Sequence, residues 1–347
     1  MYRKLGVLLV NLGSPEHPTT GSIRDFLAAF LSDKRVVGLP RLLWWIILHG
    51  IILRVRPKRL KPMYEKIWTS EGSPLLVMGQ LQAKKLQRKL SEQGYVEPVV
   101  AFACCYSKPS IEVQYQYLLS LGVTSLIVLP LYPQYAASTS GVVFHRVNAL
   151  LHPCVGRCAI RCKRPAFCKL YVEHNLPSVK YIHSYAENHH YIQAIVKSIR
   201  LYQQHKTAAE VLVLSFHGLP KSSHDRGDPY YRQCLATADA IRQALDLNEQ
   251  NCITCFQSRF GFAEWLQPYT EDTLIALAKQ GVKHIQITCP GFSADCLETL
   301  EEVAIQLKAT FIEHGGESCA YIPALNDSTL GIDLYYDLIS SCNSESN

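Results

Sequence analysis

The feature of this sequence that most limits its fold is a series of apolar runs of strand length, several of which end in a turn built on Gly or Pro. Leu5–Asn11 opens the first half of the chain in this way, and Val211–Phe216 opens the second. Similar runs lie at residues 99–103, 125–130, 179–183, 252–256, 284–289 and 318–322. Amphipathic helical stretches separate them. Buried strands that alternate with helices are typical of parallel sheets, so we predict an α/β fold with two similar domains of four strands each.

The length of the chain agrees with two domains. A single hydrophobic core rarely grows beyond roughly 250–300 residues, and this chain has 347. We predict an N-terminal domain over residues 1–185, a C-terminal domain over 186–330 and a C-terminal tail over 331–347. Two segments of the first domain differ from the rest in composition: an apolar stretch with a basic flank at 39–61, and a cysteine-rich insertion at 152–177.

Composition and charge exclude several classes of protein. Hydrophobic residues make up 48% of the chain and charged residues 18%, which excludes an intrinsically disordered protein. The net charge of +6 suits an acidic small molecule or an anionic membrane surface and is too diffuse to favour nucleic acid. No cleavage site follows the first apolar run, so we expect no signal peptide and a cytoplasmic location. The 13 cysteines should then be mostly thiols or metal ligands.

A histidine stands at the carboxyl end of the strand that opens the second half. His217 follows the apolar run 211–216 and precedes Gly218 and Pro220, which force a turn. Ligands of open parallel sheets bind outside the carboxyl ends of the strands. An imidazole there can accept a proton near neutral pH or bind a metal through its neutral nitrogen. His217 is therefore a candidate catalytic residue, provided that partner groups converge on it.

An acidic segment follows another strand of the second half. We predict that a helix begins there, with Ser293 as its N-cap and Asp295 in its first turn. On such a helix three side chains share one face at a spacing of four residues: Glu298, Glu302 and Gln306. A solvated acidic face is the commoner cause of this pattern. This helix begins at the carboxyl end of one strand, however, and His217 stands at the carboxyl end of another. The two can therefore face one site and supply a proton acceptor and a metal ligand.

The apolar stretch at residues 39–53 is too short and too interrupted to span a membrane, which needs about 20 consecutive apolar residues. It carries Trp44 and Trp45, and five cations follow it: Arg54, Arg56, Lys58, Arg59 and Lys61. We predict an exposed apolar lip with a basic flank, suited to peripheral contact with an anionic membrane or to gripping a flat apolar ligand. A buried core helix is the alternative on pattern alone.

The insertion contains four cysteines within fifteen residues: Cys154, Cys158, Cys162 and Cys168. Cationic side chains lie between them and would offset the negative charge of thiolates. Sites made of four cysteines hold a [2Fe–2S] cluster or Zn²⁺. A cysteine-rich basic loop that binds nothing is the third possibility.

Seven motifs, taken in chain order, resemble those of the ferrochelatases of bacterial type, which insert ferrous iron into a porphyrin as the last step of protoheme synthesis. The resemblance runs from residues 9–15 to 321–326, nearly the full length. The motifs are Phe30–Val37, Gly72–Leu75, Leu131–Tyr135, Ser215–Pro220, Gly227–Tyr230, Phe256–Gly261, and Cys289–Phe292 with Asp295–Glu302. No single motif is decisive, but seven in the right order are specific.

The resemblance implies two Rossmann-like domains of the chelatase type, with a porphyrin site between them and the lip at its mouth. It assigns the active-site histidine to His217 and the catalytic glutamate to Glu298, both as metal ligands, with Glu302 as a secondary acid. Many members carry a further acid where this chain has Gln306, which puts a three-member acidic row in doubt. The implied substrates are a porphyrin and Fe²⁺, and the implied assembly is a monomer or homodimer.

A porphyrin is flat, apolar and edged by propionates, so its site needs aromatic walls with cations or hydroxyls at the rim. We expect walls from Tyr132, Tyr135, Trp44, Trp45 and Phe260. We expect rim contacts from Arg24, Arg35, Tyr106 and Ser138. Some ferrochelatases bind a [2Fe–2S] cluster, which favours iron–sulfur over zinc for the cysteine insertion.

Three alternative functions stay open from the sequence. Coproporphyrin III could replace protoporphyrin IX as the substrate. A cobalt chelatase of corrinoid synthesis is the nearest enzymatic rival, although such relatives usually carry a second histidine where this chain has Glu298. A porphyrin carrier without catalysis would need the same site but no acids facing the histidine.

Overall fold

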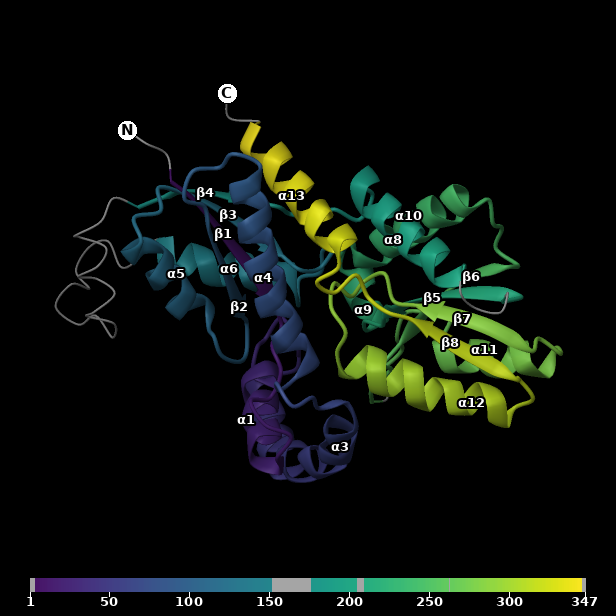
Figure 1. Cartoon of the computed structure of the whole chain (residues 1–347). Helices are drawn as coiled ribbons and strands as arrows, with labels where there is room; N and C mark the ends of the chain where they lie inside the picture. Colours follow the sequence, from purple (N-terminus) through teal and green to yellow (C-terminus); the bar gives the residue numbers. More distant parts are fainter. Residues whose placement is uncertain (1–3, 152–175, 205–208, 262, 345–347) are drawn as a thin grey trace.

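The computed structural model describes residues 4–151, 176–204, 209–261 and 263–344. Two four-stranded sheets form its framework, and all of their strands pair in parallel (Figure 1). The first contains β1 (Leu5–Asn11), β2 (Val99–Cys104), β3 (Ser125–Pro130) and β4 (Ser178–Tyr181). The second contains β5 (Val211–His217), β6 (Cys252–Gln257), β7 (His284–Thr288) and β8 (Ser318–Ile322). The predicted α/β class with four strands in each half is confirmed.

The two sheets share one topology. The spatial order is β2-β1-β3-β4 in the first sheet and β6-β5-β7-β8 in the second, so β1 and β5 occupy equivalent central positions. Both central strands are almost entirely buried, which explains their continuous apolar sequence. The likeness between the two opening strands therefore reflects a structural repeat. Their carboxyl ends, at Asn11 and His217, occupy the positions where ligands bind in such sheets.

Helices cover the sheets at the places that the amphipathic patterns indicate. Those around the first sheet are α1 (Thr20–Leu31), α4 (Pro74–Glu92), α5 (Ile111–Ser120) and α6 (Ser140–Leu151). Those around the second are α8 (His189–Gln203), α9 (Lys221–Asp225), α10 (Tyr230–Leu245), α11 (Thr270–Lys279) and α12 (Lys308–Glu313). Side-chain caps fix several of the starts: Thr19, Ser110 and Asn188 each accept a hydrogen bond from a backbone N–H in the first turn.

The predicted C-terminal tail at 331–347 is wrong for most of its length. Helix α13 (Thr329–Ser344) occupies this segment and buries Ile332, Leu334, Tyr335 and Leu338. It packs against α4 of the first half and α8 of the second (Figure 1). Apolar side chains at helical spacing drive this packing, and they stood in the sequence among polar residues that suggested a tail. The helix joins the two halves through a shared core.

The lip consists of α2 (Arg41–Ile47), a short π-helix η1 (Leu48–Ile52) and α3 (Leu53–Ile67). Its outer side exposes seven large apolar side chains: Leu39, Leu42, Leu43, Trp45, Ile46, Ile51 and Val55. The exposed patch agrees with the predicted lip and not with a core helix. The two tryptophans differ, however. Trp45 is 60% exposed, whereas Trp44 is buried and donates from Nε1 to the Leu31 carbonyl at 2.7 Å. Trp44 is therefore a core residue, not a wall of a binding site.

The acidic helix also differs from prediction. It is a π-helix, η2 (Glu298–Leu307), and it begins three residues after Asp295. Ser293 therefore does not cap it. Asp295 lies before the helix, where its carboxylate accepts hydrogen bonds from Tyr321 at 2.6 Å and Asn326 at 2.7 Å. These bonds tie the loop after β7 to β8 and to the segment that follows it.

Candidate active site

His217 ends β5 and presents a defined face of its ring. Its Nδ1 lies 2.6 Å from the carbonyl oxygen of Gly218. A carbonyl only accepts, so Nδ1 carries the proton in the neutral ring and Nε2 keeps its lone pair. No hydrogen bond among the described residues occupies that Nε2. In its neutral form, the imidazole is thus oriented so that Nε2 can act as a base or a ligand.

The turn after His217 is held by a close approach between two backbones. Gly218 donates from its N–H to the Gln257 carbonyl at 2.8 Å, and Gln257 pairs with His217 across β5 and β6. A Cβ at Gly218 would come within 2.8 Å of that carbonyl oxygen. Only glycine fits here without a shift of the strand ends. The Tyr230 hydroxyl adds a hydrogen bond to the His217 carbonyl at 2.9 Å.

The end of β6 joins His217 to the acidic helix. The buried Gln257 side chain donates from Nε2 to the backbone carbonyl of Glu298 at 2.7 Å. The next residue, Ser258, binds the Glu302 carboxylate twice, through its N–H at 2.7 Å and its hydroxyl at 2.5 Å. Ser258 has a φ of +65°, a left-handed conformation that is uncommon outside glycine. These contacts bring together the histidine and both predicted acids.

Electrostatics confirm that these three side chains share one environment. Burial raises the pKa of the Glu302 carboxyl, while the hydrogen bonds from Ser258 and the charge of His217 lower it. The neighbouring Glu298 raises the pKa of Glu302 further because two carboxylates in one site disfavour a second charge. Glu302 therefore lies within electrostatic reach of both His217 and Glu298.

Helix α3 of the lip supplies further groups near Glu298. Burial lowers the pKa of the Arg56 guanidinium, and the nearby Glu298 carboxylate opposes that shift. Arg56 lies 4.3 Å above the ring of Phe260 and forms no ion pair within the described part of the chain. Burial also raises the pKa of Tyr64, and Glu298 and Cys296 raise it further. A guanidinium and a phenol thus lie beside Glu298, the predicted catalytic glutamate.

Three of the predicted porphyrin contacts form a second group, on the first sheet's side of the site. Tyr106 donates from its hydroxyl to Asp33 at 3.1 Å, and Arg35 lies 3.5 Å from the same carboxylate. Arg35 is therefore already paired. The Tyr132 hydroxyl is buried and has no hydrogen-bond partner in the described structure. Burial raises the pKa of Tyr132, and Cys105, Tyr106 and Cys296 raise it further. Because these neighbours come from both halves of the chain, Tyr132 lies between the two halves.

Three other predicted contacts are not brought to this site by any hydrogen bond, ion pair or ring contact of the described residues. Tyr135 stacks on Phe144 at 6.2 Å, and its N–H donates to Gln233 at 2.7 Å. Arg24 is exposed on α1, and Ser138 is half-buried in the loop after β3. Their roles toward a porphyrin stay predictions.

The four cysteines of the insertion, Cys154, Cys158, Cys162 and Cys168, lie outside the described residues. The eight buried cysteines that the structure describes are free thiols. Burial raises the pKa of Cys252 to about 11 and that of Cys255 to about 12, so this C-x-x-C pair stays protonated. Within the described ranges, no group of three or more His, Cys, Asp or Glu side chains is arranged to hold a metal ion.

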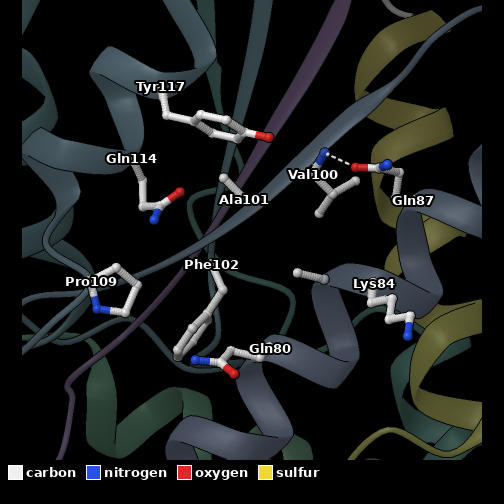
Figure 2. Close-up of a pocket in the computed structure, with 10 residues that line it drawn as sticks. Gln80, Lys84, Gln87, Val100, Ala101, Phe102, Pro109, Gln114 and Tyr117 are labelled. Carbon is white, nitrogen blue, oxygen red and sulfur yellow. Dashed lines mark hydrogen bonds between the residues drawn. The ribbon is translucent and has the colours of Figure 1, made fainter.

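A separate open pocket of about 360 Å³ lies over β2, between α4 and α5 (Figure 2). Its polar lining includes Gln80, Lys84, Gln87 and Gln114, and Gln87 caps the Val100 N–H at 3.0 Å. None of the predicted site residues lines it. It is therefore distinct from the site at the strand ends.

Several residues of the site have roles that the sequence did not predict. Gln257 and Ser258 belong to the Phe256–Gly261 motif, but their hydrogen bonds to Glu298 and Glu302 depend on the strand register. Arg56 appeared only as one of five flanking cations. Its position beside Glu298 depends on the packing of α3 against η2.

The arrangement combines an imidazole whose Nε2 has no hydrogen-bond partner among the described residues with two carboxylates of hard donor type. Imidazole and carboxylate together suit a borderline divalent ion such as Fe²⁺. The imidazole can also accept a proton from a substrate N–H. The site can therefore couple proton removal to the placement of a metal ion.

Comparison with known proteins identifies relatives over almost the whole chain. The family model described as ferrochelatase matches residues 4–342. A ferrochelatase of Teredinibacter turnerae is 44% identical over 336 residues, covering 97% of this chain and 87% of that protein. A ferrochelatase of Alcanivorax borkumensis is 43% identical over 337 residues, covering 97% and 93%.

Solved structures support the fold at lower identity. SirB from Bacillus subtilis, determined with Fe³⁺, superposes with a TM-score of 0.51 at 14% identity and covers 99% of this chain and 98% of that one. DR2241 from Deinococcus radiodurans, described as structurally similar to chelatases, gives a TM-score of 0.51 at 11% identity. It covers all of this chain and 56% of the larger protein. These likenesses concern the fold alone.

Proposed function

This chain belongs to the ferrochelatase family, and on that premise we propose that it inserts Fe²⁺ into protoporphyrin IX through His217 and Glu298. It is a metal–porphyrin chelatase. The single observation that carries the assignment of residues is the convergence of His217, Glu298 and Glu302 at the ends of β5 and β6. Anaerobic addition of Fe²⁺ to purified protein and protoporphyrin IX, followed by absorbance, tests the activity.

The chemistry of insertion assigns a role to each side chain. A free-base porphyrin holds two pyrrole N–H protons, and both must leave as the metal enters. The lone pair on Nε2 of His217 accepts a pyrrole proton, because its Nδ1 is already committed to the Gly218 carbonyl. Glu298 offers a carboxylate to Fe²⁺ before the pyrrole nitrogens replace it. Glu302, whose pKa is raised, can accept the second pyrrole proton and pass it on to solvent.

The porphyrin itself would contact groups from both halves and from the lip. The unpartnered Tyr132 hydroxyl and the unpaired Arg56 guanidinium are the polar groups best placed to meet a ligand. Arg56 can pair with a propionate, and such a charged group is better bound by a guanidinium than by water-exposed lysines. Tyr106 and Arg35 contribute less because both already bind Asp33.

The family favours iron over the cobalt alternative, since the relatives named above are ferrochelatases. It also favours catalysis over porphyrin carriage, for which the acids beside His217 would be unnecessary. The division into domains near residues 185 and 186, and a monomeric or homodimeric assembly, remain predictions.

We further propose that the lip places the enzyme on membranes. Its seven exposed apolar side chains lie next to three exposed cations, Arg54, Lys58 and Arg59. In the part of the chain that the structure describes, no helix is long and apolar enough to cross a bilayer. An apolar patch with a basic flank is instead typical of reversible binding at the surface of anionic membranes. Such binding would deliver an apolar porphyrin directly to the site.

Flotation with anionic liposomes should show binding that weakens as salt rises, because salt screens the cationic flank. A variant with Trp45→Ser and Ile51→Ser should float less, since these side chains are 60% and 62% exposed on the lip. Val113→Ser is the matched control, because Val113 is 57% exposed on α5, away from the lip. Equal flotation of both variants, or binding that only detergent releases, would contradict the proposal.

We also propose that Cys154, Cys158, Cys162 and Cys168 bind one [2Fe–2S] cluster. The support is the spacing of four thiols among cations, which offset the negative charge of a cluster. Such a cluster would order the insertion, because the free energy of metal binding becomes folding free energy. It would take no part in iron insertion.

Anaerobically purified protein should be red-brown and contain about two irons and two sulfides per chain, the content of that cluster type. Replacement of any one of the four cysteines by Ser should remove the colour. Cys319→Ser, at a buried thiol of β8, should leave the colour unchanged. One zinc per colourless chain would favour the zinc site, and metal-free protein would show that the loop binds nothing.

A further inference from the structure

Glu301 lies in η2 between the two acids of the site, yet it points into the protein. Its side chain is 2% exposed. A buried carboxylate is costly unless other groups satisfy both of its oxygens. Two residues from different elements do so here, and neither belongs to the site described above.

Each oxygen of the Glu301 carboxylate has its own partner. Oε1 accepts a charge-assisted hydrogen bond from Nζ of Lys66 at 3.0 Å, and Oε2 accepts from Nε2 of Gln306. Lys66 stands in the last turn of α3 and keeps half of its side chain in water. Glu301 therefore connects the lip helix to the acidic helix and also connects two turns of the acidic helix to each other.

The bond between Glu301 and Gln306 is specific to the π conformation. The two residues are five apart, which is the spacing of backbone hydrogen bonds in a π-helix. In an α-helix, side chains that face each other are three or four residues apart, so this pair would point in different directions. π-Helices are rare, and long ones need support from side chains. The hydrogen bond that Gln306 donates to Glu301 is such a support.

The ion pair between Lys66 and Glu301 fixes η2 from outside, through α3. α3 also places Arg56 and Tyr64 beside Glu298, and burial together with Glu298 raises the pKa of Tyr64. Lys66, in the last turn of α3, holds that helix against η2 through its ion pair with Glu301. A shift of either helix would therefore move Glu298 relative to Arg56.

We propose that Lys66, Glu301 and Gln306 are positioning residues for metal insertion. They keep η2 in its π register and fixed to α3, so that Glu298 keeps its position beside Arg56 and Glu302 keeps its position beside Ser258. This inference rests on the proposed role of those two acids. None of the three residues needs to touch the metal or the porphyrin.

Gln306→Glu gives the sharpest test. If Gln306 supports the π-helix, this substitution lowers activity, whereas if the acidic row benefits from a third member, it raises activity. It puts a second carboxylate against Glu301 and breaks the bond, but it also extends the acidic row of Glu298 and Glu302. If Gln306 supports the π register, kcat/KM for Fe²⁺ should fall by about tenfold to a hundredfold, the usual effect of removing an orienting partner near a metal site. The KM for porphyrin should stay within about twofold, because Gln306 lies away from the porphyrin contacts. An increase in activity would overturn the proposal.

Lys66→Met removes the connection to α3 from a partly exposed position, so the protein should still fold. Lys283→Met is the matched control, since Lys283 is similarly exposed and pairs with Glu317 at 3.6 Å, at the end of β7 opposite the loop that leads to η2. Lys66→Met should lower kcat/KM for Fe²⁺ by about tenfold, and Lys66→Arg should restore it. Lys283→Met should insert iron as the wild type does. Lys66→Met should also lower the melting temperature, because one oxygen of the buried Glu301 carboxylate loses its partner, so the kinetics are measured where circular dichroism shows every variant to be folded.

Equal kinetics for Lys66→Met and Lys283→Met would overturn the inference. If His217→Ala were inactive in the same series, the proposed function would still stand. An inactive wild-type enzyme would instead overturn the proposed function and the inference together.

Discussion

The His217→Ala enzyme should keep its fold and lose about a hundredfold or more in turnover, the lower range for removal of a general base. A hundredfold corresponds to about 2.7 kcal/mol of transition-state stabilisation. The loss should be large because the ring is already oriented, with Nδ1 bound to Gly218 and Nε2 available. Circular dichroism checks the fold, and anaerobic Fe²⁺ insertion under saturating porphyrin measures turnover.

A second histidine provides the control for this experiment. His189 is exposed at the start of α8, far in sequence from β5 and outside the site. His189→Ala should insert iron at the wild-type rate. Near-normal turnover in His217→Ala would remove the histidine from the mechanism, whatever the control shows.

Glu298→Gln should abolish Fe²⁺ insertion while porphyrin binding persists. The substitution keeps the shape of the side chain and leaves the backbone bond from Gln257 intact, so the start of η2 should not move. It removes the negative charge that attracts Fe²⁺ and leaves a carboxamide, a weaker ligand for the ion. Fluorescence titration with porphyrin, together with insertion kinetics, separates the two effects.

Glu302→Gln should be less damaging than Glu298→Gln. Both oxygens of Glu302 already accept hydrogen bonds from Ser258, and burial raises its pKa, so it is a poorer ligand for a metal ion. A carboxamide can keep one of these bonds through its oxygen. Greater damage in Glu302→Gln than in Glu298→Gln would reverse the two roles.

The parts of this fold that the sequence predicts are those set by local pattern. Buried parallel strands need continuous apolar runs, so β1, β3 and β5 could be located within one residue of their ends. His217 followed from the same logic, because the residue after a buried strand lies at the ligand-binding edge of the sheet. The family motifs then pointed to Glu298.

The parts that sequence reasoning missed depend on contacts between distant segments. A helix pattern does not reveal whether the backbone bonds span four or five residues, so the π conformation of η2 was not predicted. Lys66 and Glu301 are 235 positions apart, and no local signal pairs them. Trp44 and Trp45 are neighbours in sequence, but helical geometry sends one into the core and the other to the surface.

The central claim is that one histidine and one glutamate carry out metal insertion into a bound porphyrin. The most direct measurement is the rate of anaerobic Fe²⁺ insertion per bound protoporphyrin IX, compared for wild type, His217→Ala and Glu298→Gln, with coproporphyrin III as the second substrate. We predict rapid insertion by the wild type, preferentially into protoporphyrin IX, and rates at least about a hundredfold lower in both variants, although each binds the porphyrin. A wild-type protein that binds porphyrin without inserting iron, or a variant that inserts it at the wild-type rate, would contradict the claim.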